Sequence, residues 1–198
     1  MKQNFAAIIL GGTGQVGGAA VTELLEIPEC REVVMVTRKP IAARSRVRTV
    51  VLDTGASDFA ERTAALGREV LSQGPASAVS CVGVGFGSRR WSEEDLKRLE
   101  LGVVGAFARG CHKAGIGQFC LLSAVGSTAS SRFRYVRVMG MKEDTVRNIG
   151  LPASPSFALA SLSATLIPPP GPVCLEALCL GRLAISMREF SLAQSPQN

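Results

Sequence analysis

The chain has 198 residues, of which 46% are hydrophobic and 19% charged. This length corresponds to one domain, and the composition provides enough apolar material for a core and too little charge for a disordered chain. The net charge of +6 is weak evidence for nucleic-acid binding, because the basic cluster at residues 38–48 contains no aromatic side chain on which a base could stack. The single histidine, His112, excludes a metal site that needs two imidazoles. We therefore expect no nucleic-acid partner and no bound metal.

Strand and helix patterns alternate along the first 150 residues. Continuous apolar runs, typical of strands covered on both faces, predict strands at residues 5–10, 33–36, 47–52, 78–84 and 119–123. Helices are predicted at residues 16–25, 58–71 and 132–149, with another beginning after Ser92, which has the acidic Asp95 three residues on. This last helix places five apolar residues on one face: Leu96, Leu99, Val103, Phe107 and Cys111. The alternation predicts an α/β protein with a doubly wound parallel sheet.

A glycine-rich motif joins the first strand to the first helix. It consists of Gly11, Gly12, Thr13, Gly14, Gln15, Val16 and Gly17. Glycines at this spacing allow a sharp turn and let the backbone approach a diphosphate, which the helix N-terminus then attracts. The motif predicts a Rossmann-like, NAD(P)-binding domain, and the alternative is a flexible turn without a ligand.

Basic residues follow the second strand. Dinucleotide-binding domains that select NAD have an acidic residue at this place instead. Arg38 lies 21 residues after Gly17 and is followed by Lys39. An arginine at this place accommodates a 2′-phosphate, so we expect NADP(H) to be favoured over NAD(H), unless these residues form only an exposed basic turn. Asp53, at the end of the third strand, either lies near the adenine or forms a turn.

The chain resembles the short-chain dehydrogenase/reductase superfamily in its atypical branch, and most of all the Tat-interacting-protein-like oxidoreductases. The resemblance covers about residues 4–150 and includes the glycine motif and four further segments: Val36–Arg38, Cys81–Gly83, Leu121–Gly126 and Phe133–Gly140. It implies that Cys81, Val82 and Gly83 contact the cofactor. It also implies that Ser123 and Tyr135 bind and protonate the oxygen of a carbonyl-containing small molecule, and that Tyr135 contacts the cofactor as well. The alternative for this lone tyrosine is an amphipathic rim residue.

One residue departs from the family's catalytic motif. The superfamily has a lysine four residues after the tyrosine, and this chain has Met139 there. Lys142 and Arg132 lie on the same helix face as Tyr135 but do not restore the motif. Our first hypothesis is an NADP(H)-dependent oxidoreductase. The alternative is a non-catalytic NADP(H)-binding sensor or scaffold, because the departure weakens catalysis more than it weakens cofactor binding.

The composition changes at residue 151, so we divide the chain into a dinucleotide-binding domain (residues 1–150) and a tail rich in Pro, Ser and Leu (residues 151–198). The tail lacks the Arg-Pro pair of relatives, which suggests an altered reading frame or an alternative terminal exon. Patterns in the tail predict a strand at 157–162 and at most one helix, near 173–185. No signal peptide or membrane span is predicted. We expect six reduced thiols and a cytoplasmic location, and we leave open a homodimer or a protein partner. The six thiols belong to Cys30, Cys81, Cys111, Cys120, Cys174 and Cys179.

Overall fold

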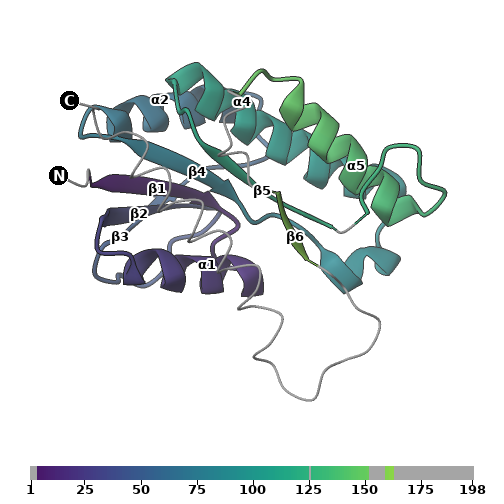
Figure 1. The fold of residues 1–198 in the computed structure, drawn as a ribbon, viewed down its shortest axis with the longest axis horizontal. Helices are drawn as coiled ribbons and strands as arrows, with labels where there is room; N and C mark the ends of the chain where they lie inside the picture. The colour runs from purple at the N-terminus through teal and green to yellow at the C-terminus, as the bar shows by residue number, and fades with distance from the viewer. Residues whose placement is uncertain (1–3, 125, 152–158, 163–198) are drawn as a thin grey trace, which may run out of the picture.

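The computed structural model describes residues 4–124, 126–151 and 159–162. Six strands form one parallel sheet in the order β3-β2-β1-β4-β5-β6 (Figure 1). The strands are β1 (Phe5–Leu10), β2 (Cys30–Thr37), β3 (Val47–Val51), β4 (Ala76–Ser80), β5 (Phe119–Ala124) and β6 (Leu159–Leu162). The predicted α/β class and doubly wound sheet are confirmed.

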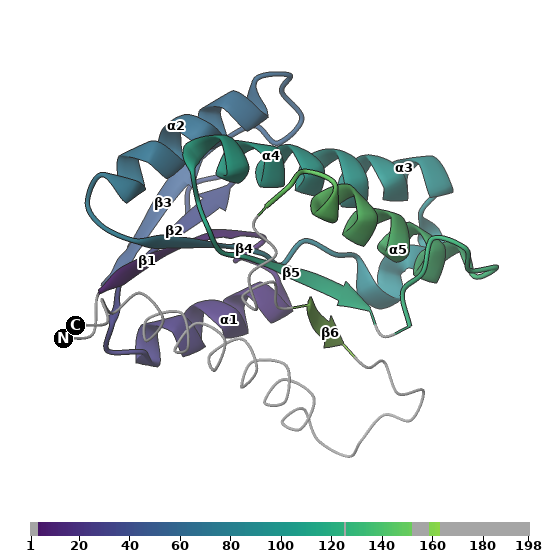
Figure 2. The same cartoon turned by 45° about the horizontal axis from the view of Figure 1, so that its top comes forward.

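Helices cover both faces of the sheet. Helix α1 (Gln15–Glu26) lies on one face, and α2 (Phe59–Leu71), α4 (Val104–Ala114) and α5 (Arg134–Arg147) lie on the other (Figure 2). Since successive side chains of a strand point to opposite faces, β1 contributes to two cores. Ile8 packs in one core with Phe59 and Phe107, and Ile9 packs in the other with Leu24.

The helix predicted after Ser92 is built from three pieces. It begins as α3 (Glu93–Lys97), continues as a π-helical turn, η2 (Arg98–Val103), and ends as α4. Its predicted N-cap is confirmed, because the Ser92 hydroxyl accepts a hydrogen bond from the Asp95 amide at 3.0 Å. The π turn changes which side chains face the core. Leu99 is only half-buried, and Glu100 is fully buried in its place.

Several other boundaries differ from the sequence prediction; the second strand, for example, was expected from Val33 and begins at Cys30. Strand β4 ends at Ser80, so residues 81–84 form a connection that leads into a 3-10 helix, η1 (Gly85–Arg90). The strand expected at 157–162 is described only as β6, from Leu159 to Leu162, and the helix expected near 173–185 lies outside the described residues.

The following properties hold for the described ranges, residues 4–124, 126–151 and 159–162. None of the helices there has the length and apolar character that crossing a membrane requires. No three metal-ligating side chains gather into a cluster within the same ranges. The cysteines at positions 30, 81, 111 and 120 are free thiols, as expected, while Cys174 and Cys179 lie outside the described residues.

Candidate functional site

The glycine turn lies where the strand order of the sheet reverses. Strand β1 pairs with β2 on one side and with β4 on the other. The connection that follows β1 therefore leads toward one edge of the sheet, and the connection that follows β4 leads toward the other edge. In open parallel sheets such a switch point leaves a crevice at the carboxyl ends of the strands, where ligands bind. The turn Gly11–Gly17 and the connection Cys81–Val84 follow the two central strands, and we call the second of these the β4 segment.

Two glycines of the turn are required by close backbone contacts. Gly11 has a φ of +86°, and a Cβ there would lie 2.8 Å from the carbonyl carbon of Cys81. A Cβ at Gly17 would lie 2.0 Å from the carbonyl oxygen of Gly11. The glycine turn therefore packs directly against the first turn of α1 and against the β4 segment. A residue with a side chain at Gly11 or Gly17 would prevent this packing.

The N-terminus of α1 is open toward an anion. Its N-cap residue is Gly14, which has no side chain to accept from the free amides, and the first turn of the helix contains no acidic residue. Gly14 is exposed, and the atom nearest to an added Cβ is the Gly11 oxygen at 3.4 Å. Gly12 is buried, Thr13 and Gln15 are exposed, and Val16 is half-buried. Free amides and a partial positive charge fit a phosphate group.

The β4 segment runs beside this turn. The Cys81 amide donates to the Leu10 carbonyl at 2.8 Å, which fixes the start of the segment to the end of β1. Cys81 and Val82 are half-buried, and Gly83 is exposed. Burial raises the pKa of the Cys81 thiol to about 12, so this sulfur is neutral at physiological pH and is not a nucleophile.

The predicted adenosine-side residues lie at the carboxyl ends of β2 and β3. Arg38 and Lys39 are exposed beyond β2. Two other members of the basic cluster have structural partners instead: Arg46 donates to backbone carbonyls, and Arg48 pairs with Glu69 at 2.6 Å. Asp53 is exposed, and its carboxylate accepts from the Gly55 amide at 2.9 Å, which is the contact expected of a turn-forming aspartate.

Ser123 lies at the end of β5 and is almost fully buried. Its hydroxyl donates to the Glu143 carboxylate and lies 3.3 Å from the Ser127 hydroxyl. Glu143 is itself buried and pairs with Arg147 at 2.9 Å. A hydroxyl has only one proton to donate, so this arrangement leaves Ser123 no proton for a substrate oxygen.

Tyr135 lies in the first turn of α5 and is half-buried. Burial, and secondarily the nearby Glu100 carboxylate, raise the pKa of its phenol to about 12. No hydrogen bond joins Tyr135 to Ser123 among the residues that the structure describes. Met139, at the place of the family's lysine, is buried with 1% of its surface exposed, so an apolar group occupies that position.

The nearest lysine along the helix has another partner. Lys142 is fully buried and pairs with the equally buried Glu100 at 2.8 Å. Burial lowers the pKa of the Lys142 ammonium, while Glu100 acts in the opposite direction. The ammonium therefore does not serve the phenol in the way that the family's lysine does.

Sequence reasoning missed Glu100 and Glu143. Each is an acidic residue on a helix face that otherwise packs into the protein, which is the one signal that could have revealed them. The apolar stripe of the helix after Ser92 instead predicted Leu99 as the inward residue, and the π turn reversed that choice.

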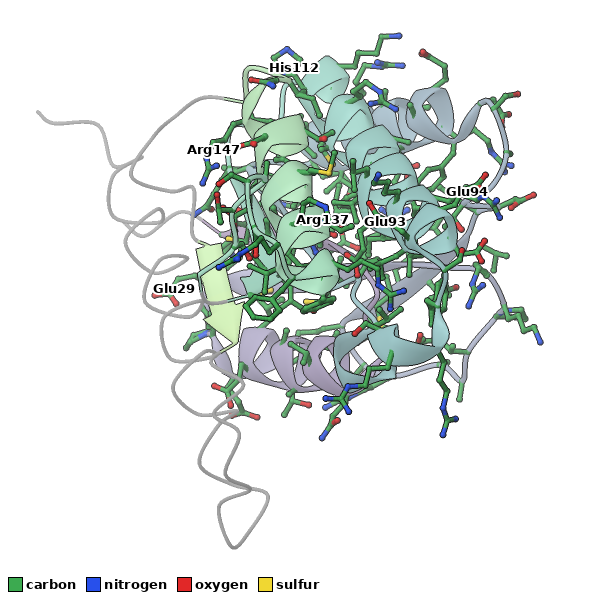
Figure 3. The ribbon with its side chains drawn as sticks, turned by 90° about the vertical axis from the view of Figure 1, so that its right-hand side faces the viewer. Glu29, Glu93, Glu94, His112, Arg137 and Arg147 are labelled. Carbon is green, nitrogen blue, oxygen red and sulfur yellow. The ribbon has the colours of Figure 1, made fainter. Side chains whose placement is uncertain are left out.

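A second ion pair joins α5 to α3. Arg137 and Glu93 point toward each other across the two helices and lie 2.8 Å apart (Figure 3). This pair is partly exposed, and together with the Lys142–Glu100 pair it fixes α5 against the helical path that leads from the β4 segment.

Comparison with curated proteins gives partial matches. No family model matches the chain. The chain is 30% identical over 142 residues to "Protein fmp52, mitochondrial" of Aspergillus clavatus, covering 72% of this chain and 60% of that protein. It is 27% identical over 150 residues to the protein of the same name in Debaryomyces hansenii, covering 74% and 62%. The matches thus span less than two thirds of the length of these relatives.

These names overturn one expectation. The predicted cytoplasmic location is wrong, because the curated relatives are named as mitochondrial proteins. The prediction rested on reduced cysteines and on the lack of a recognised signal, and neither property distinguishes the cytoplasm from other reducing compartments.

Solved structures share the architecture. The Citrobacter triphenylmethane reductase complexed with NADP(H) matches with a TM-score of 0.58 and 15% identity, over 79% of this chain and 49% of that chain. The Bordetella bronchiseptica enzyme WbmH in complex with NAD+ matches with a TM-score of 0.53 and 14% identity, over 75% and 54%. At these identities the likeness shows the fold alone. The chain has the Rossmann-type fold of these dinucleotide-binding proteins, and its sequence is similar to the fmp52 proteins.

Proposed function

We propose that this chain binds NADP(H) at the switch point of its sheet, as the nucleotide-binding part of an oxidoreductase of the short-chain dehydrogenase/reductase type. One observation carries the proposal: the uncapped N-terminus of α1 adjoins a turn in which Gly11 and Gly17 leave room only for backbone. The finer resemblance to the Tat-interacting-protein-like branch, and the mitochondrial location in the relatives' names, belong to the same proposal.

Different residues would bind different parts of the dinucleotide. The amides between Gly12 and Gly17 would hold the diphosphate, apart from the Gly14 amide, which donates to the Gly11 carbonyl at 3.1 Å and so helps Gly11 to shape the turn. Arg38 and Lys39, exposed beyond β2, would pair with a 2′-phosphate and so favour NADP(H), and Asp53 would lie near the adenine. The β4 segment and Tyr135 would line the nicotinamide side. When bound, this cofactor supplies or accepts a hydride.

The acceptor would be a small molecule with a carbonyl group. At neutral pH a phenol with a pKa of about 12 stays protonated, so Tyr135 would donate a hydrogen bond, or a proton, to the carbonyl oxygen. Ser123 would help only after its hydroxyl leaves Glu143. This chemistry is weaker than that of a site with the complete motif.

Calorimetric titration with NADPH and NADH tests the proposal directly. We expect both to bind and NADPH to bind more tightly, with saturating NADPH raising the unfolding temperature. A ligand at one hundred times its dissociation constant stabilises the folded state by about 2.7 kcal/mol. A folded sample that binds neither dinucleotide would refute the proposal.

A second candidate function is dinucleotide binding without catalysis, in a sensor or scaffold. The buried Met139 favours it, because no cation lies where the motif needs one to lower the pKa of Tyr135. This function predicts NADPH binding without NADPH oxidation on a panel of carbonyl compounds. Turnover that disappears in Tyr135→Phe would exclude it.

A further inference from the structure

The most deeply buried ion pair in the described part of the chain joins α5 to the π-helical turn. Lys142 comes from α5 and Glu100 from η2, and neither side chain has any exposed surface. Their charged atoms lie 2.8 Å apart. The pair also adjoins two groups of the candidate site, since the charge of Glu100 acts on Tyr135 and the charge of Lys142 acts on Cys81.

The same two side chains reach the backbone of the β4 segment. The Lys142 ammonium donates to the Val82 carbonyl at 3.4 Å, and the Glu100 carboxylate accepts from the Val84 amide at 3.3 Å. The contacts lie on either side of Gly83. One end of the β4 segment is fixed to β1 through Cys81, and the buried pair fixes the other end.

Stability alone gives little reason for this arrangement. Replacing a buried ion pair by apolar residues of similar volume is often neutral or stabilising, because desolvation offsets the attraction between the charges. Helix α5 already buries Val138, Met139 and Val146. The π turn brings Glu100 inward, and such turns occur frequently at functional sites. The pair therefore calls for a role beyond packing.

We propose that Glu100 and Lys142 are positioning residues that hold the β4 segment in the conformation that the bound dinucleotide requires. This inference rests on the proposed function, because it assigns the β4 segment to the nicotinamide side of the cofactor. The pair acts through the Val82 carbonyl and the Val84 amide, and it does not touch the reacting atoms.

The test uses two double variants and one control in the full chain. Glu100→Leu with Lys142→Met removes both backbone contacts and leaves no unpaired charge. Glu100→Gln with Lys142→Met restores an acceptor for the Val84 amide. The control is Lys113→Met, which removes the lysine of an exposed ion pair with Glu61, on α4 and α2. Each variant is measured for NADPH affinity, for unfolding temperature, and for hydrogen exchange of the Val84 amide without cofactor.

We expect the Leu/Met variant to stay folded, to bind NADPH at least tenfold more weakly, and to exchange the Val84 amide faster. The Gln/Met variant should recover part of the affinity and of the amide protection, and Lys113→Met should change neither. If the pair had a purely structural role, the Leu/Met variant would have a lower unfolding temperature, and the Gln/Met variant would recover neither NADPH affinity nor protection of the Val84 amide.

Failure of the inference differs from failure of the proposed function. Native NADPH affinity together with native Val84 exchange in the Leu/Met variant overturns the positioning role and leaves the proposed function intact. If the native chain binds no dinucleotide, the proposed function fails. The role toward the dinucleotide then fails with it, and Val84 exchange shows only whether the pair holds the segment: faster exchange in the Leu/Met variant supports that contact, and unchanged exchange overturns it.

Discussion

Two adjacent glycines of α1 should respond to the same substitution with opposite signs. At Gly17 an added Cβ would lie 2.0 Å from the Gly11 oxygen and 2.8 Å from the Gly12 Cα, and both are backbone atoms that cannot rotate away. At Gly18 the nearest atom to an added Cβ is the Gly12 oxygen at 3.8 Å, an ordinary contact. Gly17→Ala must therefore push the turn away from the helix, while Gly18→Ala only adds a better helix former.

The expected magnitudes follow from these contacts. Overpacking of a well-packed site costs about 1–3 kcal/mol, which for a chain of this size lowers the unfolding temperature by about 2–12 °C. Alanine exceeds glycine in helix propensity by about 1 kcal/mol, so Gly18→Ala should raise the unfolding temperature by about 2–4 °C. Because the displaced turn supplies the proposed phosphate amides, Gly17→Ala should also lose affinity for NADPH, and Gly18→Ala should keep it.

Thermal unfolding with and without NADPH measures both effects in one experiment, and calorimetry gives the affinities. The single Trp91 provides a fluorescence signal for unfolding. The reasoning is refuted if Gly17→Ala keeps the full stabilisation by NADPH, or if the two variants shift the unfolding temperature by the same amount in the same direction.

Three further outcomes are expected. Arg38→Asp should weaken NADPH binding at least tenfold and leave NADH binding unchanged. Arg44→Asp, a control in the same basic cluster, should change the affinity for neither dinucleotide. An equal loss of affinity for both dinucleotides in Arg38→Asp would contradict a role in selecting the 2′-phosphate. Folding raises the pKa of the only tyrosine, Tyr135, from about 10 to about 12. The unfolded chain therefore loses this proton first, and stability should fall between pH 10 and pH 12, less steeply in Tyr135→Phe; a tyrosinate absorbance midpoint near 10 would oppose this. Met139→Lys should lower the pKa of Tyr135 and, because it buries an ammonium, should lower the unfolding temperature without NADPH; an unchanged tyrosinate midpoint would show that position 139 does not act on the phenol.

The fold could be predicted because its signals are local. The apolar run Phe5–Leu10 is buried at every position, as expected of a central parallel strand. The glycine spacing predicted a turn, and the structure gives two of its glycines definite steric reasons. Strand β4 was predicted too long, because Cys81 and Val82 are apolar and nothing in the sequence marks the place where sheet pairing stops.

The contacts of the candidate site could not be predicted because they depend on distant segments. Ser123 was assigned by its place at the end of β5, but its hydrogen-bond partner Glu143 comes from a helix 20 residues later. Glu100 faces inward only because a π turn adds a residue to the helical path. A pattern of three- and four-residue spacing assumes a regular helix and therefore cannot find such a residue.

The residues proposed to bind the dinucleotide differ in their charge environment from Tyr135, the residue proposed to take part in catalysis. The groups proposed to hold the dinucleotide are backbone amides and exposed basic residues, and none of them depends on the missing lysine. The phenol, by contrast, is half-buried, with the Glu100 carboxylate near it and no cation at Met139. Burial first, and Glu100 second, raise its pKa where the family's arrangement lowers it. A protonated phenol can donate to a carbonyl oxygen but cannot remove a proton from an alcohol. If Tyr135 faces a substrate, this chain should therefore reduce carbonyl compounds at neutral pH and should oxidise the corresponding alcohols only at strongly alkaline pH.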